Sequence, residues 1–112
     1  MQIRQIEFGT PEYDEAVRLR YDILRRPLGL EYTPEQLAAE YSEIHLAAFD
    51  ATGRLIAYLN LTPVTPDTVK MRQVAVESIL QGKGIGKLLV GASEQLAKHL
   101  GYKEISLHAR DT

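Results

Sequence analysis

The feature that most constrains this chain is a cluster of glycines between a strand-like segment and an amphipathic helix. Residues 69–76 favour a strand, and the glycine cluster at 81–86 follows after a short turn. The apolar residues beyond it recur three and four positions apart, the spacing of one buried face of an α-helix. They are Ile85, Leu88, Leu89, Ala92, Leu96, Ala97 and Leu100. A strand that leads through glycines into a helix predicts a phosphate-binding turn, because the first helical amides lack internal partners and the helix dipole adds positive charge.

Two well-known phosphate loops do not fit this stretch. A Walker A loop requires G-x-x-x-x-G-K-[ST], but the segment from Gly82 to Lys87 is one residue short and Leu88 provides no hydroxyl for Mg²⁺. A dinucleotide fingerprint requires G-x-G-x-x-G. Gly82 and Gly84 match its first two glycines, whereas the third position is Lys87.

A third pattern, [QR]-x-x-G-x-[GA], fits without a gap at Gln81, Gly84 and Gly86. The stretch therefore resembles the acetyl-coenzyme A loop of the GCN5-related N-acetyltransferase (GNAT) family, which also has a strand before the loop and a long helix after it. The alternative is a glycine turn that only packs a helix onto a sheet.

Composition limits the other possibilities. The 112 residues suffice for one domain with one core, and the net charge of −2 argues against nucleic acid as the main partner. The absence of cysteine excludes disulfides, thiolate catalysis and zinc–cysteine sites. No apolar run approaches the length of a membrane span, and residues 1–8 lack the apolar core of a signal peptide. We expect a cytoplasmic protein without a metal or membrane partner.

The remaining segments predict a mixed α/β sheet in the order β-α-α-β-β-β-α-β. Thr10-Pro11 and Thr33-Pro34 each open a helix, the second with Gln36 completing a capping box. The first helix is expected to end at Arg26-Pro27 and the second near Ser42. Strands are expected at residues 2–8, 44–49, 54–61, 69–76 and 103–109, the last two parallel through a right-handed crossover.

The sequence also predicts which side chains of the two middle strands share a face and where these strands are connected. Alternation places Leu55, Ala57, Leu59 and Leu61 on one face of their strand. Pro63 and Pro66 are assigned to the connection that follows. Arg72 and Gln73 are expected on opposite faces, so that only one of them faces the cleft.

With this order, the resemblance covers the whole chain, and residues 1–112 are expected to form a single GNAT domain. Relatives usually continue with another helix and two strands, and that helix commonly carries a tyrosine that protonates the coenzyme A thiolate. The sequence stops at Asp111-Thr112, so we expect a C-terminally incomplete domain with slow acetyl transfer. We also expect an uncovered edge at residues 103–110 that permits a homodimer through the last strand.

The resemblance implies roles for the cofactor strand and loop. The backbones of Val74, Ala75 and Val76 would pair with the pantetheine arm of acetyl-CoA, and the Val74 amide would stabilise the oxyanion. The pyrophosphate would be held at the glycine loop and the start of the helix. The residues concerned are Gln81, Gly82, Lys83, Gly84, Ile85, Gly86 and Lys87.

The acceptor is expected to be a primary amine of a small molecule or protein. By the same resemblance, Glu31 and Tyr32 would bind it. Candidate proton-transfer groups are Glu77, acting through water or alternatively a turn residue, and His108, whose ordinary pKa suits a base but which is alternatively structural. Tyr58 is a further internal candidate. Two other functions remain open: a non-catalytic acyl-CoA-binding module and, less well supported, a dinucleotide-binding enzyme.

Overall fold

The protein was analysed as a computed structural model, which describes residues 1–107. Five strands form one mixed sheet in the spatial order β1-β2-β3-β4-β5, antiparallel except for the parallel pair β4–β5. The strands are β1 (Gln2–Ile6), β2 (Ile44–Phe49), β3 (Leu55–Thr65), β4 (Thr68–Val76) and β5 (Glu104–Leu107). The α-helices are α1 (Pro11–Arg20), α2 (Pro34–Ala38) and α3 (Ile85–His99). The predicted fold class and element order are confirmed.

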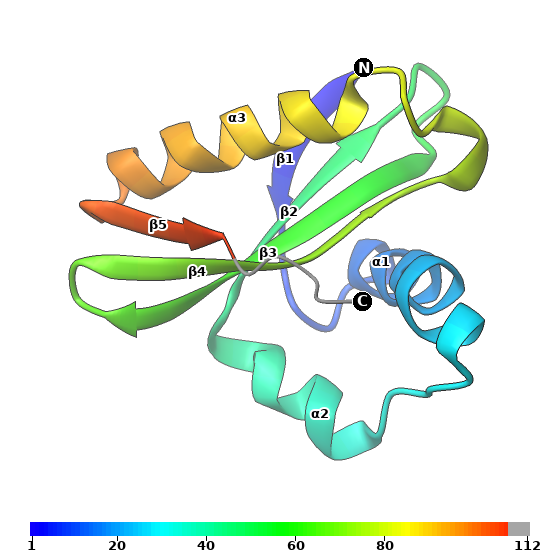
Figure 1. The fold of residues 1–112 in the computed structure, drawn as a ribbon, viewed down its shortest axis with the longest axis horizontal. Helices are drawn as coiled ribbons and strands as arrows, with labels where there is room; N and C mark the ends of the chain where they lie inside the picture. The colour runs from blue at the N-terminus through cyan, green and yellow to red at the C-terminus, as the bar shows by residue number, and fades with distance from the viewer. Residues whose placement is uncertain (108–112) are drawn as a thin grey trace.

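Helices cover both faces of the sheet (Figure 1). On the α3 face, a buried cluster includes Leu59, Leu61, Met71 and Leu89. On the α1 face, a second cluster includes Ala16, Leu19, Phe49 and Tyr58. Burial of these apolar side chains is the main favourable term in folding, at roughly 1.5–3 kcal/mol for each large side chain. None of the helices within residues 1–107 is both long and apolar enough to cross a membrane.

The two predicted helix starts form as expected. The Thr10 hydroxyl accepts a bond from the Tyr13 amide at 3.3 Å, and Thr33 and Gln36 make both bonds of a capping box. The end of the first helix differs from the prediction. The chain continues from α1 through a π-helical turn at residues 21–25 into a 3₁₀ turn at residues 26–28 that contains Pro27. Proline is tolerated there because the first turn of a helix does not need its missing N–H.

Two predictions about β3 were wrong, both because alternation does not reveal local irregularities. Ala48 pairs with Ala57, but the next residue of β2 pairs with Leu55, so β3 carries one extra residue. This bulge turns Leu55 to the α1 face, whereas Ala57 packs on the α3 face. Pro63 lies inside β3 rather than in the connection. Pairing with β2 ends at Leu61, so one flank of β3 is open where the proline stands.

Candidate active site

The glycine loop folds into an open helix N-terminus. Gly82 and Gly84 have φ of 81° and 84°, a region that glycine enters without steric cost, and Gly84 is the N-cap of α3. No side chain caps this end, and its first turn contains no acidic residue. The amide of Leu88 makes the bond to the Gly84 carbonyl, at 3.1 Å, so the three amides before it have no partner within the helix. This end of α3 is therefore suited to bind an anion.

Two contacts fix the loop against the end of β4. The side-chain amide of Gln81 donates a hydrogen bond to the Val76 carbonyl at 3.0 Å. A Cβ at Gly86 would lie 3.5 Å from a methyl group of Val76, so the start of α3 packs closely on this strand. The predicted cofactor residue Gln81 therefore uses its side chain to position the loop. Lys83 and Lys87 are exposed beside the open amides.

The strand segment predicted to receive pantetheine lies directly before this loop. Ala75 is buried in the α1-face cluster, whereas Val74 and Val76 pack against the α3-face cluster. Within the described residues, β5 pairs with β4 only from Thr68 to Met71. The described part of β5 therefore ends before it reaches residues 74–76, which continue β4 up to the glycine loop.

A bulge in β4 separates its paired half from this segment. Tyr58 pairs with Ala75 and Asn60 with Arg72, so β4 carries one residue more than β3 between these pairs. Gln73 lies in the bulge with φ of 57°, the single positive φ of a non-glycine residue in the described part of the chain. The predicted opposition of Arg72 and Gln73 was wrong: because of the extra residue, both line the same cavity.

That cavity, of about 220 Å³, opens between the bulge and the segment around α2. Its lining residues are Arg25, Tyr32, Gln36, Ala39, Glu40, Glu43, Arg72 and Gln73. The Tyr32 hydroxyl donates to the Gln73 side-chain oxygen at 2.8 Å. The guanidinium carbons of Arg20 and Arg25 lie 4.7 and 4.3 Å from the centre of the Tyr32 ring. Of the two predicted acceptor residues, Tyr32 lines the cavity, whereas Glu31 is exposed outside it.

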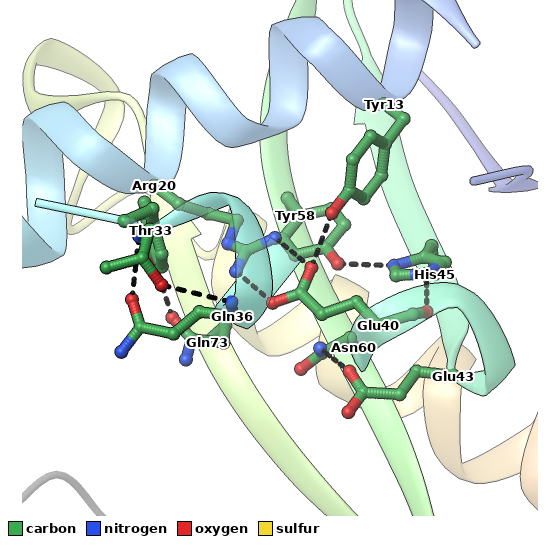
Figure 2. A network of polar contacts seen from close by, with 11 residues as sticks. Tyr13, Arg20, Thr33, Gln36, Glu40, Glu43, His45, Tyr58, Asn60 and Gln73 are labelled. Atoms are coloured by element: carbon green, nitrogen blue, oxygen red, sulfur yellow. Dashed lines mark hydrogen bonds and ion pairs between the residues drawn. The ribbon is translucent and has the colours of Figure 1, made fainter. Parts of the chain in front are cut away.

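A buried ion pair holds Glu40, which lines this cavity, to Arg20 of α1 (Figure 2). Both terminal nitrogens of Arg20, which is fully buried, donate to the Glu40 carboxylate, at 2.8 and 2.5 Å. Tyr13 donates a third bond to Glu40 at 2.8 Å. Burial alone would raise the pKa of Glu40, but the hydrogen bonds and charge of Arg20 outweigh it and hold this pKa below its ordinary value. Glu40 is therefore a structural group that is charged at neutral pH.

A second buried pair continues from Glu40 to β3. The His45 Nε2 lies 3.0 Å from the Glu40 carbonyl, and its Nδ1 lies 2.6 Å from the Tyr58 hydroxyl (Figure 2). A carbonyl only accepts, so Nε2 carries the proton and Nδ1 accepts from Tyr58. Burial lowers the pKa of His45 and raises that of Tyr58. Tyr58 is completely buried, so the structure gives no support to it as the acid that protonates a thiolate.

Glu43 provides the remaining carboxylate of the cavity. It is half-buried directly before β2, and the Asn60 side-chain amide donates to its Oε1 (Figure 2). Burial raises the pKa of Glu43, and the neighbouring charge of Glu40 raises it further. Glu43 was not identified from the sequence.

Of the two predicted proton-transfer residues, only Glu77 lies in the described part of the chain, and it does not line this cavity. Glu77 lies 3.1 Å from Arg54 in an ion pair and lines a separate hollow beside α1. His108 lies outside the described residues. Sequence reasoning also missed the supporting residues Arg20, Glu40 and His45. One signal was available, because Arg20 stands on the apolar stripe of the first helix, where a charge requires a buried partner.

Comparisons with known proteins agree with this architecture. The model of the acetyltransferase (GNAT) family matches residues 2–112. A crystal structure of an aminoglycoside 6'-N-acetyltransferase complexed with coenzyme A is similar, with 23% identity and a TM-score of 0.74. The alignment covers 96% of this chain and 61% of that one, so the chain spans about three-fifths of that protein's length.

Two further structures show the same fold. A ribosomal-protein-alanine N-acetyltransferase from Brucella melitensis biovar Abortus 2308 has 19% identity and a TM-score of 0.74, covering 100% of this chain and 83% of that one. A putative N-acetyltransferase from Lactobacillus plantarum has 18% identity and a TM-score of 0.81, with coverages of 99% and 77%. Because the family model matches residues 2–112 of the 112 in this chain, the chain belongs to the acetyltransferase (GNAT) family.

Proposed function

We propose that this chain transfers an acetyl group from acetyl-CoA to a primary amine of a small molecule or protein. The observation that carries the proposal is the open N-terminus of α3, which the bond from Gln81 to the Val76 carbonyl holds directly beside the end of β4. An anion bound at this helix end would lie next to a ligand that follows residues 74–76. Membership of the family supports the same ligand, as does the similar aminoglycoside 6'-N-acetyltransferase, which was crystallised with coenzyme A.

The proposed roles follow from these placements. The amides of residues 82–87 hold the pyrophosphate, with charge from Lys83 and Lys87. The backbone of residues 74–76 orients the pantetheine arm and thioester. The Val74 amide stabilises the negative oxygen that develops during attack.

The acceptor enters the cavity that Tyr32, Arg72 and Gln73 line at the β4 bulge. Because Gln73 is followed directly by Val74, this cavity adjoins the proposed thioester site. The similar aminoglycoside and ribosomal-protein-alanine enzymes are named for different acceptors, but both are N-acetyltransferases. We therefore propose primary amines in general as acceptors and do not assign one particular acceptor.

Calorimetry with acetyl-CoA tests the cofactor site. Gly84→Val places a branched side chain at φ of 84° in the proposed pyrophosphate turn, and we expect the affinity to fall at least about tenfold, or 1.4 kcal/mol. The matched control is Gly53→Val, which imposes similar backbone strain at φ of 87° in the β2–β3 hairpin. Equal acetyl-CoA affinity in the two variants would show that the loop does not bind the cofactor.

A second assay separates an enzyme from an acyl-CoA-binding module. Acetyl-CoA is mixed with the chain and either an aminoglycoside or a peptide that begins with alanine, and free thiol is measured. An acetyltransferase releases coenzyme A thiol only when an acceptor amine is present. Binding of acetyl-CoA without amine-dependent thiol release would favour the binding module.

A further inference from the structure

Resting on the proposed function, we propose that Glu43 is the carboxylate that holds the ammonium group of the acceptor and takes its proton before attack. The substrates would then be amines that are protonated in solution. The base would be a residue that directly precedes β2. Glu43 lines the cavity at the β4 bulge and accepts a hydrogen bond from Asn60.

Glu43 shares the cavity with the bulge of β4. Its side chain lines the same space as Arg72 and Gln73, although it comes from the segment directly before β2. Asn60 connects the two, because it pairs with Arg72 in the sheet and donates its side-chain amide to Glu43. Since Val74 follows Gln73, a group bound by Glu43 lies on the acceptor side of the proposed thioester site.

The two carboxylates of the cavity have different contacts. Glu40 is bound by both terminal nitrogens of Arg20 and by Tyr13. Glu43 forms no ion pair within residues 1–107, and its hydrogen bond comes from the neutral amide of Asn60 at Oε1. The other neighbouring donor is the neutral hydroxyl of Thr62, so no charged group of residues 1–107 neutralises Glu43 by direct contact. Of the two, Glu43 is therefore the carboxylate suited to a cationic amine.

The electrostatic surroundings of Glu43 also favour proton transfer. Burial and the Glu40 charge raise the pKa of Glu43, whereas a hydrogen bond from Thr62 and the charges of Arg72 and Arg20 lower it. Arg25 lines the same cavity and adds positive charge. The net direction of the pKa is upward, which makes the carboxylate a stronger base than an exposed glutamate.

The backbone at the cavity is strained in a way that is typical of functional sites. A non-glycine residue with positive φ is strained and persists only where its surroundings hold it in place. Gln73 adopts this conformation and is held by the 2.8 Å bond from Tyr32. The side chain of Gln73 therefore lines the same cavity as Arg72 and Glu43.

The proposed step balances in protons and electrons. The acceptor R–NH₃⁺ gives one proton to the Glu43 carboxylate and becomes R–NH₂. The nitrogen lone pair attacks the thioester carbonyl carbon, a C–N bond forms, and the C–S bond breaks with its electron pair on sulfur. The nitrogen then loses a second proton, and the thiolate takes up one proton to become the thiol. Glu43 releases to solvent the proton that it accepted. The products are the acetamide, coenzyme A thiol and one proton.

The test is a pH–rate profile of Glu43→Gln in the full chain. The glutamine carbonyl still accepts from Asn60 but cannot take a proton. We expect kcat/KM to fall by about 10²–10⁴-fold, the range for loss of a general base. We also expect the acidic decline of the wild-type profile to disappear. Glu43→Asp keeps the carboxylate and should retain that decline at a lower rate.

Two controls separate loss of the base from other causes. Glu35→Gln removes the same charge from an exposed position on α2 and should match the wild type. An arylamine acceptor, which is neutral near pH 7, should show a much smaller difference between wild type and Glu43→Gln. The melting temperature of Glu43→Gln should not fall, because the fold disfavours the charged form of Glu43.

The outcomes are distinguishable. Equal rates and equal pH profiles for Glu43→Gln and Glu35→Gln would overturn the role of Glu43 and leave the proposed function intact. A wild-type chain that binds acetyl-CoA but releases no thiol with an aminoglycoside, an alanine peptide or an arylamine would contradict the proposed function, and the role of Glu43 with it.

Discussion

At the scale of single residues, the cavity depends on a charge placed where an apolar side chain would be expected. Arg20 is fully buried on α1, and Glu40 neutralises it from the 3₁₀ turn at residues 39–42, with Tyr13 adding a third bond. The pair is costly to desolvate but strongly interdependent, because either partner alone would be a buried unpaired charge. It fixes the segment around α2, from which Glu40 and Glu43 reach the cavity.

We predict that Glu40→Gln lowers the free energy of unfolding by about 3–5 kcal/mol, because it leaves the Arg20 guanidinium buried without a counter-charge. Urea denaturation at neutral pH measures this change. The control is Glu12→Gln, which removes the exposed pair with Arg4 at 3.7 Å and should cost less than about 1 kcal/mol. Similar losses in both variants would contradict the assigned role of Glu40.

The same pair predicts the direction of acid denaturation. The pKa of Glu40 is lower in the folded chain than its ordinary value of 4.5. Its contribution to stability is therefore present above about pH 4.5 and is lost as the pH falls through the folded pKa. Urea denaturation near pH 4 and at neutral pH should therefore show a smaller loss of unfolding free energy on acidification in Glu40→Gln than in the wild type.

At the scale of elements, the relation between β4, its bulge and α3 determines the site. The bulge turns Gln73 into the cavity, residues 74–76 continue the strand, and Gln81 holds the following loop on Val76. The local signals for these elements are readable in sequence: threonine–proline caps, the apolar stripe of α3 and the glycines before it.

The bulges of β3 and β4 are not readable in the same way. Each adds one residue, and each reverses the face assigned by alternation, as Leu55 and Gln73 demonstrate. The buried network is equally hidden, because Arg20 and Glu40 meet across 20 positions of the chain. Sequence periodicity reports which face is apolar, but it does not identify the distant partner of a buried charge.

We predict that Gln81→Ala weakens acetyl-CoA binding about fivefold, since one hydrogen bond contributes about 1 kcal/mol to holding the loop. Calorimetry measures the affinity, and circular dichroism should show an unchanged fold. Gln95→Ala, at an exposed position on α3, is the control and should bind as the wild type does. Unchanged affinity in Gln81→Ala would mean that the loop keeps its position without this bond.

At the scale of the whole molecule, one sheet separates two buried clusters. Its strand β4 lines the cavity with Arg72 and Gln73 and then leads to the glycine loop before α3. The described pairing of β4 with β5 runs from Thr68 to Met71, and residues 74–76 continue β4 beyond it to the loop before α3. Within residues 1–107, β5 is the outer strand of the sheet. Self-association through this strand stays a prediction.

The most direct test of the proposed cofactor site is an NMR titration of the ¹⁵N-labelled chain with coenzyme A. We predict that the largest amide shifts occur at residues 82–87 and 74–76, because the pyrophosphate and pantetheine contact these backbones. Smaller shifts are expected at Arg72 and Gln73 beside the cavity. The proposed site would be contradicted if the largest shifts fell instead in the hollow lined by Arg54 and Glu77, with residues 82–87 unchanged.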